Sequence, residues 1–152
     1  MTSFIDQIKK LRTKTGAGIA DCRKALEEAA GDFVKAQELL KSWGIDKATQ
    51  KAGRAVGAGL VETYIHADGR IGAMVEVNCE TDFVARTDEF KNLAHELAMQ
   101  VAAMNPATVE ELLKQEYIRD SAKTVDELVR ETIAKVGENI VVKRFMRFEL
   151  GS

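Results

Sequence analysis

The chain has 152 residues, of which 45% are hydrophobic and 30% are charged, with one proline and a formal net charge of −2. This composition suits one moderate core or two small ones and excludes an intrinsically disordered protein. No stretch approaches the roughly 18 apolar residues of a membrane span, and the N-terminus lacks the apolar region of a signal peptide, so we expect a cytoplasmic protein without a membrane partner.

Charge is distributed unevenly along the chain. Residues 1–57 carry 11 Lys and Arg against 7 Asp and Glu, whereas residues 58–152 carry 11 against 17. This difference falls short of a nucleic-acid footprint, because the basic residues do not form a dense stripe with interleaved aromatics. We therefore expect no nucleic-acid partner and two modules with different surfaces.

Residues 1–48 are predicted to form a domain of three short helices. Ser3 begins a capping box at the first helix, which ends in the sequence "TGAG". A second helix is predicted to start near Ile19, and Asp32 is expected to cap a third helix that ends at Gly44. Apolar residues of the third helix are expected to form the core with the other two: Phe33, Leu40 and Trp43.

Residues 49–58 are predicted to be a basic linker, because the sequence from Ile45 to Gly59 is rich in Lys, Arg, Gly and Ala and poor in large apolar side chains. The same composition also fits a loosely docked helix. The glycines of residues 53–59 do not make a phosphate loop, since no Lys-Ser/Thr follows and no buried strand precedes them. The turn at Gly16 fails the dinucleotide fingerprint because a helix precedes it. We expect neither direct nucleotide binding nor a cofactor.

Residues 59–152 are predicted to form a small α+β domain with the element order ββααα-β. Two β-rich segments, "LVETYIH" and "RIGAMVEVNC", are separated by a hairpin turn at Asp68 and Gly69. A long helix follows and stops at Asn105-Pro106; its apolar face comprises Phe90, Leu93, Leu97, Val101 and Met104. Two shorter helices begin at the capping residues Thr108 and Thr124, the second ends at Gly137, and "NIVVKRFMRFEL" is a final strand with an exposed edge.

The residues do not assemble an enzyme active site. His66 and His95 are the only histidines, and neither has a Cys or Ser partner at helical or strand spacing. Cys22 and Cys79 belong to no CxxC motif or Cys/His cluster. We expect no catalytic residue, no metal site and no disulfide framework; a thiol-dependent enzyme acting through Cys79 is a distant alternative.

Phe83 lies in an acidic, turn-like stretch, "NCETDFVARTDEF", between a predicted strand and the long helix. On one interpretation it tucks under the turn while Asp82 caps the following helix, and burial tendencies favour this by roughly two to one. On the other it is an exposed anchor of a protein interface, oriented by Thr81 and Arg86. The residues alone leave both interpretations open.

Three long segments resemble the elongation factor Ts family: "LRTKTGAGIADCRKAL" at 11–26, "EVNCETDFVAR" at 76–86 and "KVGENIVVKRF" at 135–145. The resemblance implies a translation elongation factor of protein biosynthesis with a ubiquitin-associated-like N-terminal domain. It implies a guanine nucleotide exchange factor, and no enzyme in the usual sense, that promotes GDP release from elongation factor Tu. The partner would be bound in its GDP-bound and nucleotide-free states.

The same resemblance implies where the partner is contacted. A Thr-Asp-Phe-Val turn inserts near the magnesium and phosphate loop of the GTPase, and it matches Thr81, Asp82, Phe83 and Val84. The N-terminal domain docks on the GTPase domain through positions that match Leu11, Arg12, Ile19, Ala20 and Arg23. Arg23 stands where many members have Lys. Ile71 and Gly72 at the hairpin are a weaker expectation, because in longer members a second copy of the core supplies that contact.

Only one copy of the family's ββα core fits the sequence, and residues 105–123 are too few for the helical excursion of longer members. The chain therefore resembles a short form, which implies a homodimer, and the strand 141–150 is the candidate contact. The main alternative is a ubiquitin-associated-like adaptor that binds a helical partner or a nascent chain without exchange activity. Residues 76–86 separate the two hypotheses, because an adaptor has no use for the Thr-Asp-Phe-Val turn.

Overall fold

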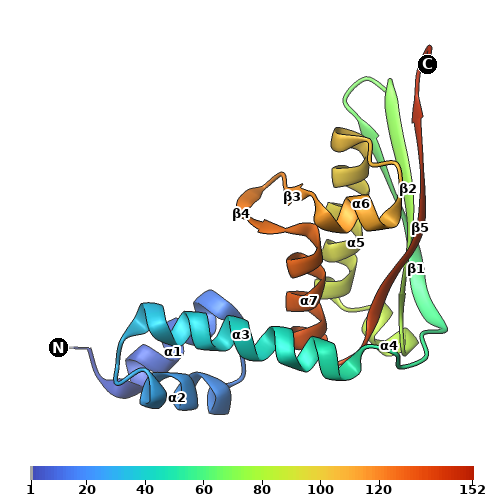
Figure 1. Cartoon of the computed structure of the whole chain (residues 1–152). Helices are drawn as coiled ribbons and strands as arrows, with labels where there is room; N and C mark the ends of the chain where they lie inside the picture. The colour runs from blue at the N-terminus through green and yellow to red at the C-terminus, as the bar shows by residue number, and fades with distance from the viewer. Residues whose placement is uncertain (1) are drawn as a thin grey trace. The chain divides into compact units, whose positions relative to one another are not determined.

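The computed structural model describes residues 2–152 of a chain that divides into two compact units, Met1–Gln50 and Lys51–Ser152. Helices make up the first unit, and an antiparallel sheet with helices makes up the second (Figure 1). The predicted α+β class is therefore confirmed.

The first unit contains three helices: α1 Phe4–Thr15, α2 Ile19–Glu28 and α3 Phe33–Lys51. The Ser3 hydroxyl caps α1 by accepting a hydrogen bond from the N–H of the third helical residue, as predicted. Gly16 ends α1 at φ 73°, a left-handed conformation that glycine adopts without a steric penalty. The core is built from all three helices: Leu11, Cys22, Ala25, Leu26, Ala29, Ala36 and Leu40.

The prediction that Gly44 ends the third helix was wrong. α3 continues through Gly44 to Lys51 and buries Ala48 in its last turns. A single glycine costs an exposed helix only about 1 kcal/mol relative to alanine, and the Ala, Lys and Gln residues that follow favour a helix. The helix thus includes the first three residues of the segment 49–58, and the next strand begins at Ala58.

The predicted core residues of α3 differ in burial. Leu40 is buried, whereas Phe33 and Trp43 are half-buried at the rim of the core. Lys24 Nζ lies 5.0 Å from the centroid of the Trp43 ring, in a cation–π arrangement. An ammonium group keeps its hydration, so an aromatic ring that contacts one lies at the edge of the core. The helical spacing of Trp43 predicted its face but not this partial exposure.

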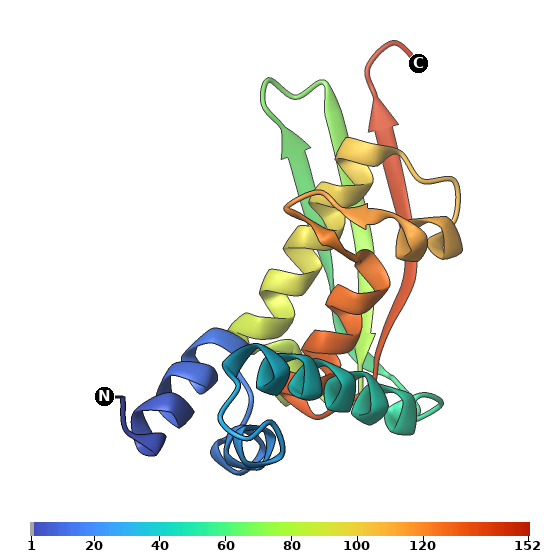
Figure 2. The ribbon, with the colours of Figure 1, turned by 60° about the vertical axis from the view of Figure 1, so that its left-hand side comes forward.

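The second unit is built on an antiparallel sheet with the strand order β1-β2-β5 (Figure 2). Its strands are β1 Ala58–His66, β2 Ile71–Cys79 and β5 Ile140–Glu149. The hairpin turn predicted at Asp68 and Gly69 joins β1 to β2, and Gly69 has φ 84°. Alternate side chains of β2 are buried under the helices: Ala73, Val75, Val77 and Cys79.

The helices of this unit are α4 Asp82–Ala85, α5 Asp88–Met104, α6 Val109–Lys114 and α7 Val125–Val136. α5 lies along one face of the sheet and α7 packs against α5 (Figures 1 and 2). The caps predicted at Thr108, Thr124 and Gly137 are confirmed. Of the predicted apolar face of α5, Met104 alone is exposed, because it is the last residue before Asn105 ends the helix.

Two short elements were not predicted. α4 is a single turn, and a hairpin of β3 Glu116–Tyr117 and β4 Asp120–Thr124 lies between α6 and α7. The hairpin depends on α5: the side-chain amide of Gln100 donates to the Glu116 carbonyl (3.0 Å) and accepts from the Ile118 N–H (3.0 Å). Contacts across such sequence distances leave no local periodicity to recognise.

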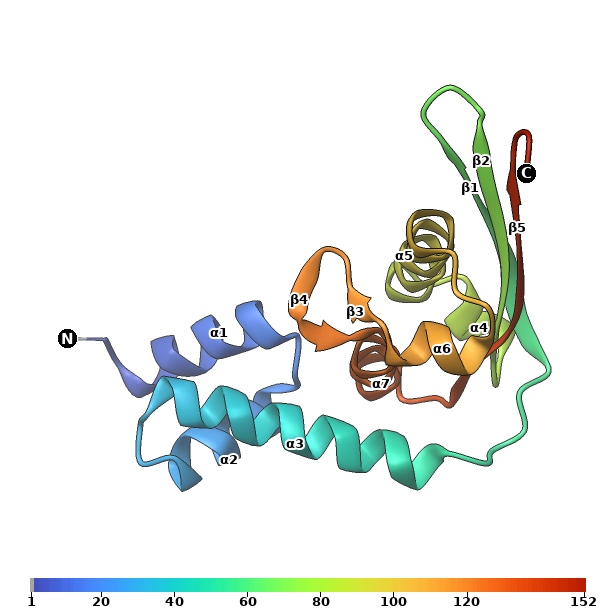
Figure 3. The ribbon, with the colours of Figure 1, turned by 45° about the horizontal axis from the view of Figure 1, so that its top comes forward.

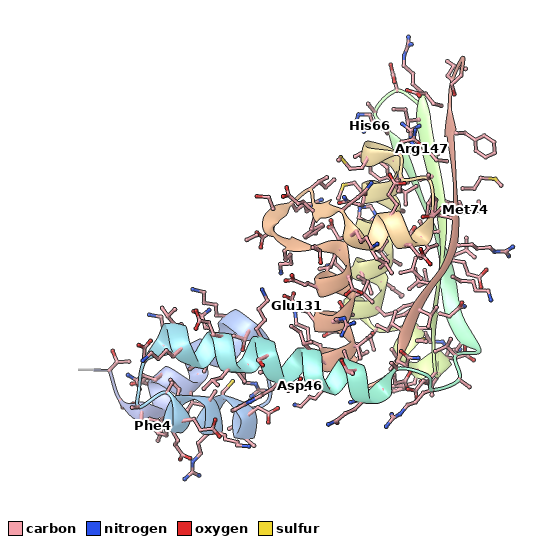
Figure 4. The ribbon with its side chains drawn as sticks, in the orientation of Figure 1. Phe4, Asp46, His66, Met74, Glu131 and Arg147 are labelled. Atoms are coloured by element: carbon pink, nitrogen blue, oxygen red, sulfur yellow. The ribbon has the colours of Figure 1, made fainter. Side chains whose placement is uncertain are left out.

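The sheet face opposite α5 carries no other element of the second unit among the residues that the structure describes (Figure 3). We call this surface the open face. Strand pairing places on it the apolar side chains Val61, Ile65, Met74, Met146 and Phe148, all of which are exposed. Figure 4 shows Met74 on this side and Arg147, which hydrogen-bonds the Ala102 carbonyl of α5, on the other. A polar pair, Glu76 and Arg144, lies among the apolar residues, 2.8 Å apart.

Candidate partner-binding site

Phe83 lies on α4, directly beyond the end of β2, and its side chain is 80% exposed. The interpretation in which Phe83 tucks under the turn was therefore wrong. An aromatic ring left in water gives up the burial free energy that a core position would provide, about 2 kcal/mol for a side chain of this size. The exposed ring is accordingly a candidate contact for a partner.

The α4 backbone is anchored on both sides of the exposed ring. The Thr81 hydroxyl accepts a hydrogen bond from the Val84 N–H (3.3 Å) and so caps α4, while Thr87 caps α5. Asp82 does not have the capping role that one interpretation gave it. Val84 and Ala85 are 5% and 7% exposed, so both side chains pack into the core of the second unit. The side chain of Val84, a predicted contact residue, is therefore not accessible to a partner.

Two carboxylates, one on each segment, join the turn to the residues that precede β5. The Glu138 carboxylate accepts hydrogen bonds from the N–H of Thr81 (3.0 Å) and from its hydroxyl (2.8 Å). The Glu80 carboxylate accepts from the Asn139 N–H (2.8 Å). Sequence reasoning missed Glu138 as a site residue, although its position inside the segment "KVGENIVVKRF" was a signal that could have found it.

Cys79 supports the same turn as a structural residue. Its side chain is buried, and Sγ donates to the Thr81 carbonyl (3.2 Å). Burial, followed by the nearby carboxylates of Glu138, Asp82 and Glu80, raises the pKa of the Cys79 thiol. A thiol with a raised pKa is protonated at neutral pH and is a poor nucleophile, so this environment argues against a thiol enzyme.

The residues expected to dock on a GTPase lie in the first unit. Ile19, Ala20 and Arg23 are exposed within the first turns of α2, and Arg12 is exposed in the last turn of α1. Arg23 forms an ion pair with Glu27 of the same helix, with the two atoms 2.9 Å apart. Leu11 is the exception to the prediction: it is fully buried and belongs to the helical core.

Ile71 and Gly72 do not join the Phe83 site. They lie at the start of β2, whereas α4 follows its end, and the eight steps between the nine strand residues, at about 3.3 Å each, separate the two by roughly 26 Å. Gly72 is on the open face beside Ile65, whose Cδ1 would be 2.9 Å from a Cβ at position 72. The hairpin is therefore a separate surface from the turn.

The two histidines lie away from the Phe83 turn. The two histidines lie near Tyr64, whose hydroxyl is 3.2 Å from His66 Nδ1 and whose ring packs edge-on against His95. Across residues 2–152 we find no group of three or more His, Cys, Asp or Glu side chains placed to hold a metal ion. No helix in that range is long and apolar enough to cross a membrane.

Comparison with known proteins assigns the chain to a family. The sequence profile described as Elongation factor TS matches residues 80–152, which begin next to the Phe83 turn. A protein named Elongation factor Ts from Thermoanaerobacter sp. (strain X514) is 47% identical over 95% of this chain and 93% of its own length. The chain belongs to the elongation factor Ts family. Membership gives it a role in translation elongation and confirms the resemblance seen in the sequence.

Two further relatives agree and add a difference in length. Proteins named Elongation factor Ts from Coprothermobacter proteolyticus and Thermotoga neapolitana are 43% and 45% identical, and this chain spans 96% and 98% of their lengths. These alignments run over 189 and 194 positions, more than the 152 residues of this chain. Such members of the elongation factor Ts family therefore carry residues that this chain lacks.

Proposed function

We propose that the chain is a guanine nucleotide exchange factor that promotes GDP release from elongation factor Tu by inserting its Thr-Asp-Phe-Val turn. The observation that supports this most is the 80% exposure of Phe83 on a turn whose next two residues, Val84 and Ala85, are buried. A large apolar side chain on an anchored backbone is typical of an interface hot spot. Membership of the elongation factor Ts family supplies the partner.

In this mechanism Phe83 acts as a wedge between helices of the GTPase domain. Burial of the ring is worth about 2 kcal/mol, and it is gained only once the partner's helices have separated. The ring therefore stabilises the open, nucleotide-free state over the closed one, as a ligand that prefers one of two conformations must. Separation of the helices would displace the groups that hold the magnesium ion and the phosphates.

Exchange requires no contact between this chain and the nucleotide. If the exchange factor weakens GDP binding by some factor, GDP weakens binding of the exchange factor by the same factor. A transient ternary complex can then lose either ligand, which explains why both the GDP-bound and the nucleotide-free partner are bound. The chain contributes binding energy to the open state and performs no bond chemistry.

Docking of the first unit would keep the turn close to its target. Ile19 is 57% exposed at the start of α2, and Ala20, Arg23 and Arg12 provide an exposed apolar and basic surface around it. Leu11 is excluded from this surface because its side chain is fully buried. The first unit would supply affinity for the GTPase, and the Phe83 turn of the second unit would supply the increase in the rate of GDP release. Variants of the two units should therefore have different kinetic effects.

The test is the release of a fluorescent GDP analogue from elongation factor Tu, followed with buffer, with the native chain and with the Phe83→Ala variant. We expect the native chain to accelerate release and Phe83→Ala to lose about 2 kcal/mol of this effect, or roughly thirtyfold in rate. Binding to the GDP-bound partner should persist through the first unit, because the ring gains its burial energy only in the open state. Calorimetry or surface plasmon resonance would measure that binding.

Met104→Ala is the matched control, because it removes an exposed apolar side chain from the far end of α5. It should accelerate release as the native chain does. Failure of the native chain to accelerate release from an active GTPase would overturn the exchange function and favour the adaptor. Equal acceleration by the native chain and Phe83→Ala would keep the function but remove Phe83 from its centre.

We also propose that two copies of the chain associate through the open face. An exposed apolar surface across three strands is typical of an interaction site. Glu76 and Arg144 make this surface self-complementary, because a two-fold axis would bring the Arg144 of each copy toward the Glu76 of the other. The hydrogen bond from Asn78, and then Arg144, lower the pKa of the Glu76 carboxyl, so it is ionised for such a pairing. The predicted contact strand, β5, contributes Met146 and Phe148 to this face.

A further inference from the structure

We propose that Glu138 is a positioning residue for nucleotide exchange: its carboxylate fixes the turn that carries Phe83. The inference rests on the proposed exchange function, and it assigns a role to a residue 55 positions away from Phe83 in the sequence. Glu138 lies between Gly137, which ends α7, and the start of β5. It touches the turn through Thr81 and is not itself part of the proposed wedge.

The two hydrogen bonds to Glu138 define the geometry of Thr81. One carboxylate oxygen accepts from the Thr81 N–H (3.0 Å) and the other from the Thr81 hydroxyl (2.8 Å). A hydroxyl has a single proton, so donation to Glu138 turns its lone pairs toward the Val84 N–H, which donates to it (3.3 Å). Glu138 therefore sets the hydroxyl direction on which the N-terminal cap of α4 depends.

Asn139, which follows Glu138, also joins the segment before β5 to the end of β2. The Asn139 N–H donates to Glu80 (2.8 Å), and the Asn139 side chain, only 5% exposed, donates to the Arg54 carbonyl (2.9 Å). Arg54 also faces Glu80 in an ion pair of 3.6 Å. Residues 138 and 139 are thus bound to residues 81 and 80 and cannot move independently of the turn.

These contacts continue the sheet beyond its last backbone pair. The β2–β5 ladder ends with Cys79 opposite Ile140, and the side-chain bonds of Glu80 and Glu138 begin at the next positions. The segment around α4 is therefore held to the sheet by side-chain hydrogen bonds that follow the last β2–β5 backbone pair. In Figure 1, α4 and the start of β5 lie at the same end of the sheet.

Without Glu138, Thr81 loses both bonds that hold it against the segment before β5, and its hydroxyl is no longer directed toward the Val84 N–H. The ring of Phe83, two residues further on, would then sample more orientations. Burial of the ring would therefore stabilise the open state of the partner less. Docking through the first unit would be unchanged. We therefore expect a lower rate of GDP release at saturating concentrations of the chain, with an unchanged half-saturating concentration.

The experiment compares Glu138→Ala, Glu138→Gln and the control Glu110→Ala in the GDP-release assay, with the concentration of the chain varied to saturation. Glu110 is exposed on α6, so its variant removes an equal charge from the same unit. Glu138→Ala should lower the saturated rate by about tenfold, since it removes two hydrogen bonds to a carboxylate. Glu138→Gln keeps one acceptor for the Thr81 N–H and should recover part of the rate. Glu110→Ala should match the native chain.

Amide hydrogen exchange of the full chain gives a readout independent of the GTPase. The Thr81 amide should be protected in the native chain and in Glu138→Gln, and should lose protection in Glu138→Ala while the amides of α5 keep theirs. Retained protection of α5 shows that the variant is folded.

A native saturated rate in Glu138→Ala, or a loss confined to the half-saturating concentration, would overturn the inference. So would an unchanged Thr81 amide. If the native chain itself fails to accelerate GDP release, the exchange function is refuted, and the amide experiment alone decides whether Glu138 holds the turn.

Discussion

Gly59 shows how one residue without a side chain allows two strands to approach. It lies in β1 opposite Asn78 with φ 138°, and a Cβ at this position would lie 2.1 Å from the Val77 carbonyl oxygen. No other residue type adopts this conformation without strain. The predicted linker ends at residue 58, and Gly59, which follows it directly, is required by the sheet.

Gly59→Ala is expected to lower the free energy of unfolding by about 2 kcal/mol or more, because the new methyl group collides with backbone that cannot move aside. Gly57→Ala is the matched control: a Cβ there meets nothing within 4 Å, and its φ is not in the left-handed region. This second change should be neutral or stabilise by up to about 1 kcal/mol. Urea unfolding followed by circular dichroism measures both. Equal midpoints for the two variants would contradict the steric argument.

The helix α2 has one buried face and one exposed face. Cys22, Ala25 and Leu26 are buried against α1 and α3, whereas Ile19 and Arg23, one turn apart, are exposed. The fold of the first unit therefore needs only one side of this helix. The other side is exposed, and it is the surface proposed to dock on the GTPase.

Ile19→Asp should raise the half-saturating concentration in the GDP-release assay by about tenfold, because an aspartate cannot bury apolar surface worth about 1.5 kcal/mol. The rate at saturation should not change. An acidic residue in the first turn is favourable for a helix, so the variant should fold. Val34→Asp makes the same change in the first turn of α3, at a side chain that is 63% exposed, and should have no kinetic effect. Identical kinetics for both variants would place docking elsewhere.

The proposed association of two copies would involve the molecule as a whole. The open face offers Met146 and Phe148, which are 60% and 70% exposed, beside Met74 of the central strand. Burial of such a surface against its own copy would remove from water apolar area that a monomer would otherwise expose. A dimer of this kind would cover β2 and β5, the strands that lead into the Phe83 turn.

Sedimentation equilibrium over a range of concentrations tests this association. The native chain should sediment as a dimer, and Met146→Lys should shift it to a monomer, because an unpaired charge would be buried in the proposed interface. Met104→Lys places the same charge at an exposed methionine on α5, outside the open face, and should leave the dimer intact. A monomeric native chain at all concentrations, or a dimer unaffected by Met146→Lys, would exclude the open face as the interface.

Local sequence signals predicted most of the elements correctly. The caps at Ser3, Thr124 and Gly137, the turn at Gly69 and the helix stop at Asn105 are all confirmed. Each depends on hydrogen bonds or dihedral angles within a few residues, so the information lies in the adjacent sequence. Resemblance in three segments identified the family, which the comparisons confirm.

Tertiary packing decided what these signals left open. Phe83 is exposed and Leu11 is buried because of what surrounds each side chain, and hydrophobicity alone does not distinguish the two. Glu138 meets Thr81 across 57 positions of sequence, and Gln100 holds the β3–β4 hairpin across 16 to 18. Local periodicity reports on neighbours along the chain, whereas a binding surface is made where distant segments meet. The sequence therefore determined the elements and the family of this protein, and only the folded chain determined which side chains a partner can reach.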